Sequence, residues 1–275
     1  MIKIAHEAPK SIFHVVQKAT DYDYALVHLL EEDEEYLQLF KDAIAKGREV
    51  ILDNSIFELE EAFDADKFAS WVEKLNPEWY IIPDALEDNI KTQSQAYSWH
   101  MNYRKDLPGK AIGVVQGKTY DEIRSCYMYM DRSIDADMIA ISFDYSYYTK
   151  TVPHPNKYQS WMLGRIKLLS DLAKDGIINK NKPHHLLGCG LPQEFMFYRK
   201  AGFNWLYSID TSNPVVHAMK KIHYTAEGLW NKESQKLFEL INAKQKDIDV
   251  SFVLSNINQF RKFVGNEPIK MDSIL

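Results

Sequence analysis

The chain has 275 residues, 45% of them hydrophobic, so it can bury a full core, and one barrel domain suits this length as well as two smaller domains do. We expect a single domain over residues 1–275. A formal net charge of −6 argues against nonspecific adhesion to a polyanion but leaves room for a local basic face. The two cysteines, Cys126 and Cys189, are too few for a disulfide framework or a thiolate-rich zinc site. Because we find no signal peptide and no apolar run of membrane length, we expect a reducing cytoplasm and no membrane partner.

Apolar runs of strand length alternate with amphipathic stretches of helical period, which predicts repeated βα units around a parallel sheet. The expected strands lie, in chain order, near residues 2–5 or 12–16, 25–30, 49–52, 79–82, 111–115, 137–142, 184–188 and 204–209. The expected helices lie near residues 33–46, 65–75, 88–105, 119–131, 156–174, 192–201 and 213–222. About eight strands with short connections favour a (β/α)8 TIM barrel, with a doubly wound sheet as the alternative.

The last part of the chain, residues 228–275, continues the apolar pattern at helical spacing. The apolar residues are Leu237, Leu240 and Ile241, then Val253, Leu254, Ile257 and Phe260. This spacing predicts two terminal helices that pack on the barrel rather than a separate domain.

Acidic and amide residues recur where the expected strands end. Asp53 follows residues 50–52, Asp84 follows residues 79–82, Gln116-Gly117 follows residues 112–115, and Asp210 follows residues 205–209. The ends of parallel strands share the one rim where barrel and doubly wound enzymes keep their chemistry. We therefore expect these polar groups to form one site, and the chain to be an enzyme.

Each of these residues also has a purely structural interpretation. An aspartate after a strand often caps the next helix or makes a turn, which holds for Asp53 taken alone. Asp84 is less needed as a cap, because Asp88 can cap the following helix. Asp210 is similarly replaceable by Thr211 or Ser212. Asp210 and Asp53 are candidates for a nucleophile and an acid/base pair, the division of labour of retaining glycoside chemistry.

Amides and glycines at the other strand ends favour a ligand with polar edges. Gln116 offers a donor and an acceptor, and Gly117 lets a ligand approach the backbone, although an ordinary turn explains both. Gly188 and Gly190 would expose backbone N–H and C=O groups at the rim, and turn chemistry is again the alternative. Cys189 between them is expected to be a small packing residue.

Five segments in this order resemble the tRNA-guanine transglycosylase superfamily. They read LDNSIFELEEAF, IIPDALED, GVVQGKTYDEI, HHLLGCGLPQE and LYSIDTSNP, and the likeness spans roughly residues 49–215. That superfamily exchanges a guanine base for a 7-deazaguanine on a (β/α)8 barrel. The resemblance implies no redox cofactor, and the incoming free base would be 7-cyano-7-deazaguanine or a relative.

The resemblance also implies roles for individual residues. Asp210 would be the nucleophile that bonds to C1′ of the nucleotide, and Asp53 would protonate the leaving guanine and deprotonate the incoming base. Asp84 would bind the N1 and exocyclic amine edge of guanine. Gln116 and backbone groups of residues 187–191 would contact the other polar edges. The sequence departs from the family at its base-stacking contacts, where Phe57 or Tyr145 is the candidate stacking face instead.

The chain departs from the family's tRNA enzymes in two respects. Those enzymes carry a zinc site of several cysteines and a histidine after the nucleophile, whereas the segment after Asp210 has His217 and His223 but no cysteine, so we predict no metal. Asn54-Ser55-Ile56-Phe57 also replaces their serine and glycine pair. A short zinc-free chain with IDTSNP most resembles the phage-encoded branch that modifies DNA to evade restriction. A monomer and a homodimer both stay open.

The polynucleotide contact is predicted around residues 145–157, where aromatic and basic residues interleave. This arrangement suits stacking on unpaired bases while phosphates are held, and an aromatic wedge would help to extrude a guanine from a duplex. Packing of Tyr158 and Trp161 in the core is the alternative for the following helix. The predicted contact residues are Tyr145, Tyr147, Tyr148, Lys150, His154 and Lys157.

Other functions also stay open. A zinc-free tRNA enzyme, a noncatalytic accessory subunit and a barrel glycosidase each fit part of the pattern. A subunit that only binds needs no nucleophile, which argues against the accessory role, whereas two carboxylates serve a glycosidase as well.

Overall fold

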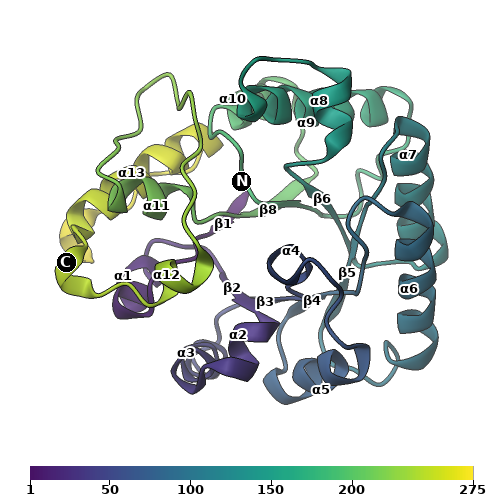
Figure 1. Ribbon diagram of the computed structural model, residues 1–275, viewed down its shortest axis with the longest axis horizontal. Coiled ribbons are helices and arrows are strands. Elements are labelled where there is room, and N and C mark those ends of the chain that lie inside the picture. Colours follow the sequence, from purple (N-terminus) through teal and green to yellow (C-terminus); the bar gives the residue numbers. More distant parts are fainter. Residues whose placement is uncertain (275) are drawn as a thin grey trace.

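The computed structural model describes residues 1–274 and has eight parallel strands in one sheet. Figure 1 shows the strands ringed by helices. The hydrogen-bonded order is β1-β8-β7-β6-β5-β4-β3-β2, so the sheet curls into a barrel that is open, among the described residues, only between β1 and β2. The strands are β1 (Lys3–Ala5), β2 (Asp23–Leu26), β3 (Val50–Asp53), β4 (Trp79–Ile81), β5 (Lys110–Val114), β6 (Met138–Ser142), β7 (His184–Leu187) and β8 (Leu206–Asp210). The predicted (β/α)8 TIM barrel is confirmed, and the doubly wound sheet is not found.

Most of the helices between successive strands lie on the outside of the barrel, whereas α4 lies over the strand ends, and α11 follows the last strand. They are α1 (Phe13–Gln17), α2 (Val27–Glu32), α3 (Glu34–Ala45), α4 (Ile56–Leu59), α5 (Ala65–Leu75), α6 (Asn89–Asn102), α7 (Tyr120–Met128), α8 (Ser146–Thr151), α9 (Lys157–Lys174), α10 (Glu194–Lys200) and α11 (Asn213–Met219). A π-helical turn, η2 (Tyr129–Ser133), extends α7. Short 3-10 turns are η1 (Lys10–Ile12), η3 (Gln245–Asp247) and η4 (Met271–Ser273). No helix in residues 1–274 has the length and apolarity needed to cross a bilayer.

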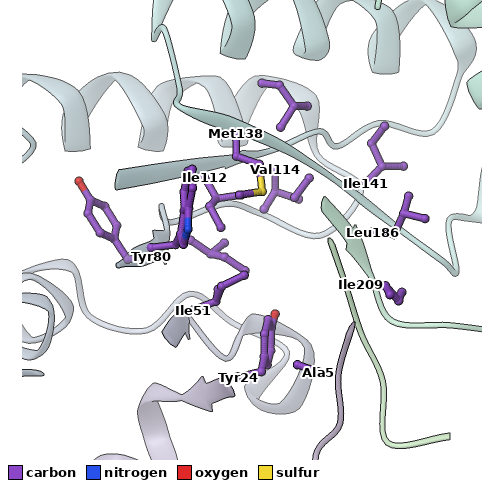
Figure 2. Close-up of a cluster of buried hydrophobic side chains, with 14 of the residues drawn as sticks. Ala5, Tyr24, Ile51, Tyr80, Ile112, Val114, Met138, Ile141, Leu186 and Ile209 are labelled. Carbon is purple, nitrogen blue, oxygen red and sulfur yellow. The ribbon is translucent and has the colours of Figure 1, made fainter. Parts of the chain in front are cut away.

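The main core fills the barrel and the layer between strands and helices. Figure 2 shows buried side chains from successive strands, among them Ile51, Ile112 and Met138, gathered in one cluster. Strands covered on both faces bury nearly every side chain, which explains why they read as continuous apolar runs.

The C-terminal part forms the two predicted helices, α12 (Leu237–Ile241) and α13 (Val250–Val264). A second apolar cluster joins α13 to α1 and α11 through Val253, Ile257, Val16 and Val215. The extension therefore packs on the barrel, as its spacing predicted.

The first strand, expected near residues 2–5 or 12–16, is found at the first of these positions as β1, and residues 13–16 lie in α1. The prediction of a strand near residues 25–30 was wrong beyond Leu26, because α2 begins at Val27. Short apolar runs do not distinguish a buried strand from a buried helix, which accounts for this error. Residues 145–157, where the polynucleotide contact was predicted, contain α8.

A buried ion pair fixes the loop that follows β7. Arg165 on α9 donates to Glu194 on α10 through Nη2 at 2.5 Å and Nε at 3.1 Å, and both side chains are 1% exposed. Arg165 Nη1 also donates to the carbonyl oxygens of Leu187 at 3.3 Å and Gly188 at 3.0 Å. Tyr198 Oη adds a bond to Glu194 Oε2 at 3.0 Å. The pair thus ties two outer helices to the end of a barrel strand.

Removing one partner of the buried Arg165–Glu194 pair should strongly lower the free energy of unfolding. We expect Arg165→Met to lower the free energy of unfolding by about 3–5 kcal/mol, because it leaves Glu194 buried without its counter-ion. Lys167→Met on the same helix breaks the exposed Lys167–Asp171 pair and should cost about 0.3–0.5 kcal/mol. Urea denaturation of both variants measures the difference. Equal losses would show that the buried pair contributes no more than a surface pair.

Candidate active site

The carboxyl ends of the strands surround one pocket of about 150 Å³. An enclosed apolar cavity of about this volume holds a benzene ring, so this pocket, which opens to solvent, has room for one small heterocycle. Its lining includes the four residues predicted from their positions at strand ends, Asp53, Asp84, Gln116 and Asp210. The other lining residues with polar side chains include Glu7, Tyr24, Asn54, Glu58, Ser142, Thr211, Ser212 and Lys232.

Asp210 ends β8 and is held from inside the barrel. Its Oδ1 accepts hydrogen bonds from His185 Nε2 at 3.1 Å and from the Gly188 backbone N–H at 3.1 Å. His185 is fully buried, and its Nδ1 lies 2.8 Å from Ser208 Oγ. A neutral imidazole with its proton on Nε2 satisfies both contacts, since Nδ1 then accepts from the hydroxyl. Within residues 1–274 no hydrogen bond goes to Oδ2 of Asp210, which leaves that oxygen for a ligand in the pocket.

Asp53 ends β3 in a different environment. Its Oδ2 accepts a short hydrogen bond from Tyr24 Oη, and its Oδ1 accepts from the Ser55 backbone N–H at 2.5 Å. Ser55 has a φ of 62°, the left-handed conformation that turns its N–H back toward the carboxylate. Burial raises the pKa of Asp53 to about 7 against the lowering effect of these two bonds, and the charges of Asp210 and Asp84 raise it further. Asp53 therefore gains and loses its proton near neutral pH.

Asp84, after β4, lies between two amides. Asn54 Nδ2 donates to Oδ1 at 2.8 Å, and Gln116 Nε2 donates to Oδ2 at 2.7 Å. Burial raises the pKa of Asp84, while the bonds from Asn54 and Gln116 oppose the rise. Gln116 Oε1 accepts from the Glu87 backbone N–H at 2.9 Å, so the amide orientation is fixed. The Asp88 side chain caps α6, as expected, and Asp84 is free of that task.

The predicted glycines divide into one pocket residue and two that lie outside it. Gly188 lines the pocket, has a φ of 63°, and a Cβ there would come within 2.5 Å of the Phe143 ring. Gly117 is not in the pocket lining: a Cβ there would clash with Glu122 at 2.8 Å, so it allows α7 to start close to β5. Gly190 also lies outside the lining, where its carbonyl accepts from Asn213 Nδ2 at 3.2 Å. The structure does not place Gly117 and Gly190 where they would bind a base.

Two phenylalanines form the apolar side of the pocket. Phe57 on α4 is 56% exposed, and its ring centroid lies 6.2 Å from that of Phe143, which follows β6. Figure 1 shows α4 over the ends of β3 and β4, inside the ring of outer helices. Phe57 was predicted, but Phe143 was missed although it also follows a strand end.

Sequence reasoning missed several polar pocket residues. Burial raises the pKa of Glu7 to about 8, helped by the charges of Asp210 and Asp53. Burial likewise raises the pKa of Glu58 well above its ordinary value, and Asp53 and Glu7 add to the rise. Glu7 comes two residues after β1, so the rule of strand ends would have found it. Lys232 follows no strand and had no sequence signal.

The prediction that three tyrosines stack on bases at the protein surface was wrong. Tyr145 is 2% exposed, Tyr147 9% and Tyr148 0%, and all three rings, from the N-cap and first turn of α8, belong to the main core. Tyr145 Oη donates to the Val115 carbonyl, and Tyr148 Oη to the Ser142 carbonyl at 2.9 Å. Close packing at Gly164, where a Cβ would come 2.3 Å from Tyr148 Cβ, keeps α8 against α9.

The other three predicted contact residues lie at or near the surface. Lys150 and Lys157 are exposed, and His154 is half-buried. Lys157 Nζ lies 5.1 Å from the ring centroid of Tyr158 and 5.2 Å from that of Trp161. Both of these rings are half-buried and pack against the main core.

The residues that a zinc site would need do not meet in the described structure. Cys126 and Cys189 are both buried, and Cys189 Sγ donates to Glu194 Oε1 at 3.3 Å, as suits a packing residue. No group of three or more His, Cys, Asp or Glu side chains among residues 1–274 is placed to hold a metal ion.

The raised pKa of Asp53 should make stability depend on pH. The native state keeps the proton from the ordinary pKa of 3.8 up to about 7, while the unfolded chain releases it, so stability falls as pH rises through this window. We expect Asp53→Asn to flatten the pH dependence of the unfolding free energy between about pH 4 and 7. Tyr24→Phe removes a bond that lowers this pKa and should move the loss to higher pH. An unchanged slope in Asp53→Asn would show that Asp53 is not held protonated.

Comparisons with known proteins do not name a family for this chain. No family model matches it, and no curated protein matches it. What points to a function is therefore the pocket and the sequence motifs that meet there.

Proposed function

We propose that this protein is a glycosyltransferase that replaces guanine in a polynucleotide, DNA rather than tRNA, with a 7-deazaguanine base. The observation that carries the proposal is the pairing of two unlike carboxyl groups in one pocket. Asp210 has one oxygen fixed by His185 and Gly188, whereas Asp53 has a pKa of about 7. A nucleophile needs the first environment, and an acid/base group needs the second.

The reaction uses these groups in two balanced steps. Asp210 Oδ2 attacks C1′ of the nucleotide, the bond from C1′ to the guanine nitrogen breaks, and protonated Asp53 gives its proton to the leaving base. Asp53, now a carboxylate, takes the ring N–H proton of the incoming 7-deazaguanine, whose nitrogen attacks C1′ and releases Asp210. No redox cofactor enters either step.

The remaining pocket groups suit a purine. Asp84, oriented by Asn54 and Gln116, offers an acceptor for the N1–H and amine edge of guanine. Gln116 Nε2 keeps its second hydrogen as a donor for the base carbonyl, and Phe57 and Phe143 offer aromatic faces for stacking. Amide side chains and aromatic rings also bind sugars, so what favours guanine exchange over glycoside hydrolysis is the likeness of the five ordered segments to the transglycosylase superfamily.

The choice of DNA depends on the likeness of IDTSNP and the surrounding segments to the phage-encoded branch. Free base partners of the class of 7-cyano-7-deazaguanine, and a host cytoplasm as the location, follow from the same likeness. A zinc-free tRNA enzyme differs only in the polynucleotide and is separated by the substrate test.

The test is incorporation of radiolabelled guanine into duplex DNA, single-stranded DNA and bulk tRNA. We expect label in DNA, none with Asp210→Asn, and a loss of about 100-fold or more with Asp53→Ala, the usual effect of removing a positioned acid/base group. Asp210→Asn is nearly isosteric, so its circular dichroism spectrum should match the wild type.

The other outcomes are distinct. Label in tRNA alone would make the protein an RNA enzyme. Full exchange by Asp210→Asn would remove Asp210 as the nucleophile. If no polynucleotide gains label and the protein releases sugar from a glycoside, the protein is a glycosidase and not a transglycosylase.

A further inference from the structure

The connection between α11 and α12, residues 220–236, brings Lys232 to the pocket and exposes the Trp230 ring nearby in the chain. Figure 1 shows this long connection looping out beside α10 before it returns to α12. Lys232 lines the pocket, and its Nζ lies 3.7 Å from the ring centroid of Phe143. Two residues before Lys232 in the chain, the Trp230 ring is 66% exposed, a large apolar surface left in water.

The backbone that carries Trp230 is fixed on both sides. Leu229 exchanges two hydrogen bonds with the Gln193 side chain, at 2.7 Å and 3.1 Å. Gly228 has a φ of 106° and approaches Gln193 so closely that a Cβ would come 2.2 Å from Oε1. Asn156 Nδ2 donates to the Trp230 carbonyl at 2.7 Å. The ring is therefore presented by an ordered backbone, which limits the entropy that a stacking ligand must remove.

The neighbours of Trp230 include a residue that the sequence predicted to contact nucleic acid. The His154 ring meets the Trp230 ring edge to face, with centroids 6.0 Å apart. Asn156, which holds the Trp230 carbonyl, lies between His154 and the exposed Lys157. An exposed aromatic ring beside basic residues is the combination that binds unpaired bases and their phosphates.

The carboxyl groups of the pocket would repel a phosphate of the polynucleotide backbone unless a cation lay between them. Five carboxyl groups line the pocket, and among the described lining residues Lys232 is the one lysine or arginine. Burial lowers the pKa of Lys232, while the charges of Asp144, Asp210 and Glu7 act to raise it. A phosphate at the pocket would supply a further negative partner for the ammonium group.

We propose that Trp230 stacks on the base next to the extruded guanine while Lys232 binds the phosphate that joins the two nucleotides. This contact depends on the proposed function for its substrate, a single strand or an opened duplex. It replaces the buried tyrosines of residues 145–148 as the aromatic contact to the polynucleotide.

Binding can be measured without catalysis. In the Asp210→Asn background, a fluorescein-labelled single-stranded oligodeoxynucleotide with one guanine is titrated by anisotropy. We expect Trp230→Ala to raise Kd roughly 5- to 150-fold, the range for losing one stacked base, and Trp230→Phe to recover most of the affinity. Tyr97→Ala, which removes a 55% exposed ring from the outer helix α6, is the matched control and should bind like its parent.

The phosphate contact of Lys232 is tested separately, by the salt dependence of binding. Lys232→Gln should reduce the slope of log K against log salt by about one, because one fewer counterion is released from the strand. An unchanged slope would remove Lys232 as the phosphate contact.

Several results would overturn the stacking contact. One is Trp230→Ala binding as tightly as Tyr97→Ala, and another is Trp230→Phe being as weak as Trp230→Ala. A change of oligomeric state in Trp230→Ala, seen by light scattering, would assign the ring to a protein contact instead. These results leave guanine exchange intact, so they are distinct from failure of the proposed function, in which no polynucleotide gains label.

Discussion

Parallel strands bring all their carboxyl ends to one rim, and this constraint determines where the central groups of the site lie. It gathers Asp53, Asp84 and Asp210 from distant parts of the chain into one pocket, with Glu7 and Glu58 beside them. Burial raises the pKa of Asp53, Glu7 and Glu58, and the negative charges of neighbouring carboxyl groups add to the rise, so these groups cannot all be ionised cheaply. The barrel therefore creates a site whose protonation is decided by each group's immediate partners.

Asp210 and Asp53 lie in different environments because their hydrogen-bond partners differ. Asp210 receives hydrogen bonds from a buried imidazole and a backbone N–H, both donors to one oxygen. Asp53 has Tyr24 and Ser55 as donors, yet burial still raises its pKa to about 7. Divergent environments for paired titratable groups are how enzymes assign acid, base and nucleophile roles. The buried Arg165–Glu194 pair supports this arrangement at a distance, because Arg165 also binds the Gly188 carbonyl beside Asp210.

The barrel and its rim could be predicted because they follow from local periodicity and strand ends. Asp53, Asp84, Gln116 and Asp210 were found in this way, and Phe143 and Glu7 obey the same rule. What could not be predicted depends on tertiary packing. The orientation of the tyrosines on α8 is decided by its contact with α9, and Gly117 serves the approach of α7 rather than a ligand. Lys232 reaches the pocket from a connection with no regular structure, where no sequence period applies.

Mass spectrometry of a trapped complex shows directly whether Asp210 forms a bond to the nucleotide. The protein is mixed with a guanine-containing polynucleotide without an acceptor base, denatured, and digested with nuclease and protease. We expect a nucleotide adduct on the peptide that contains Asp210. An adduct on the peptide of Asp53 or Glu7, or base exchange without any adduct, would contradict this expectation.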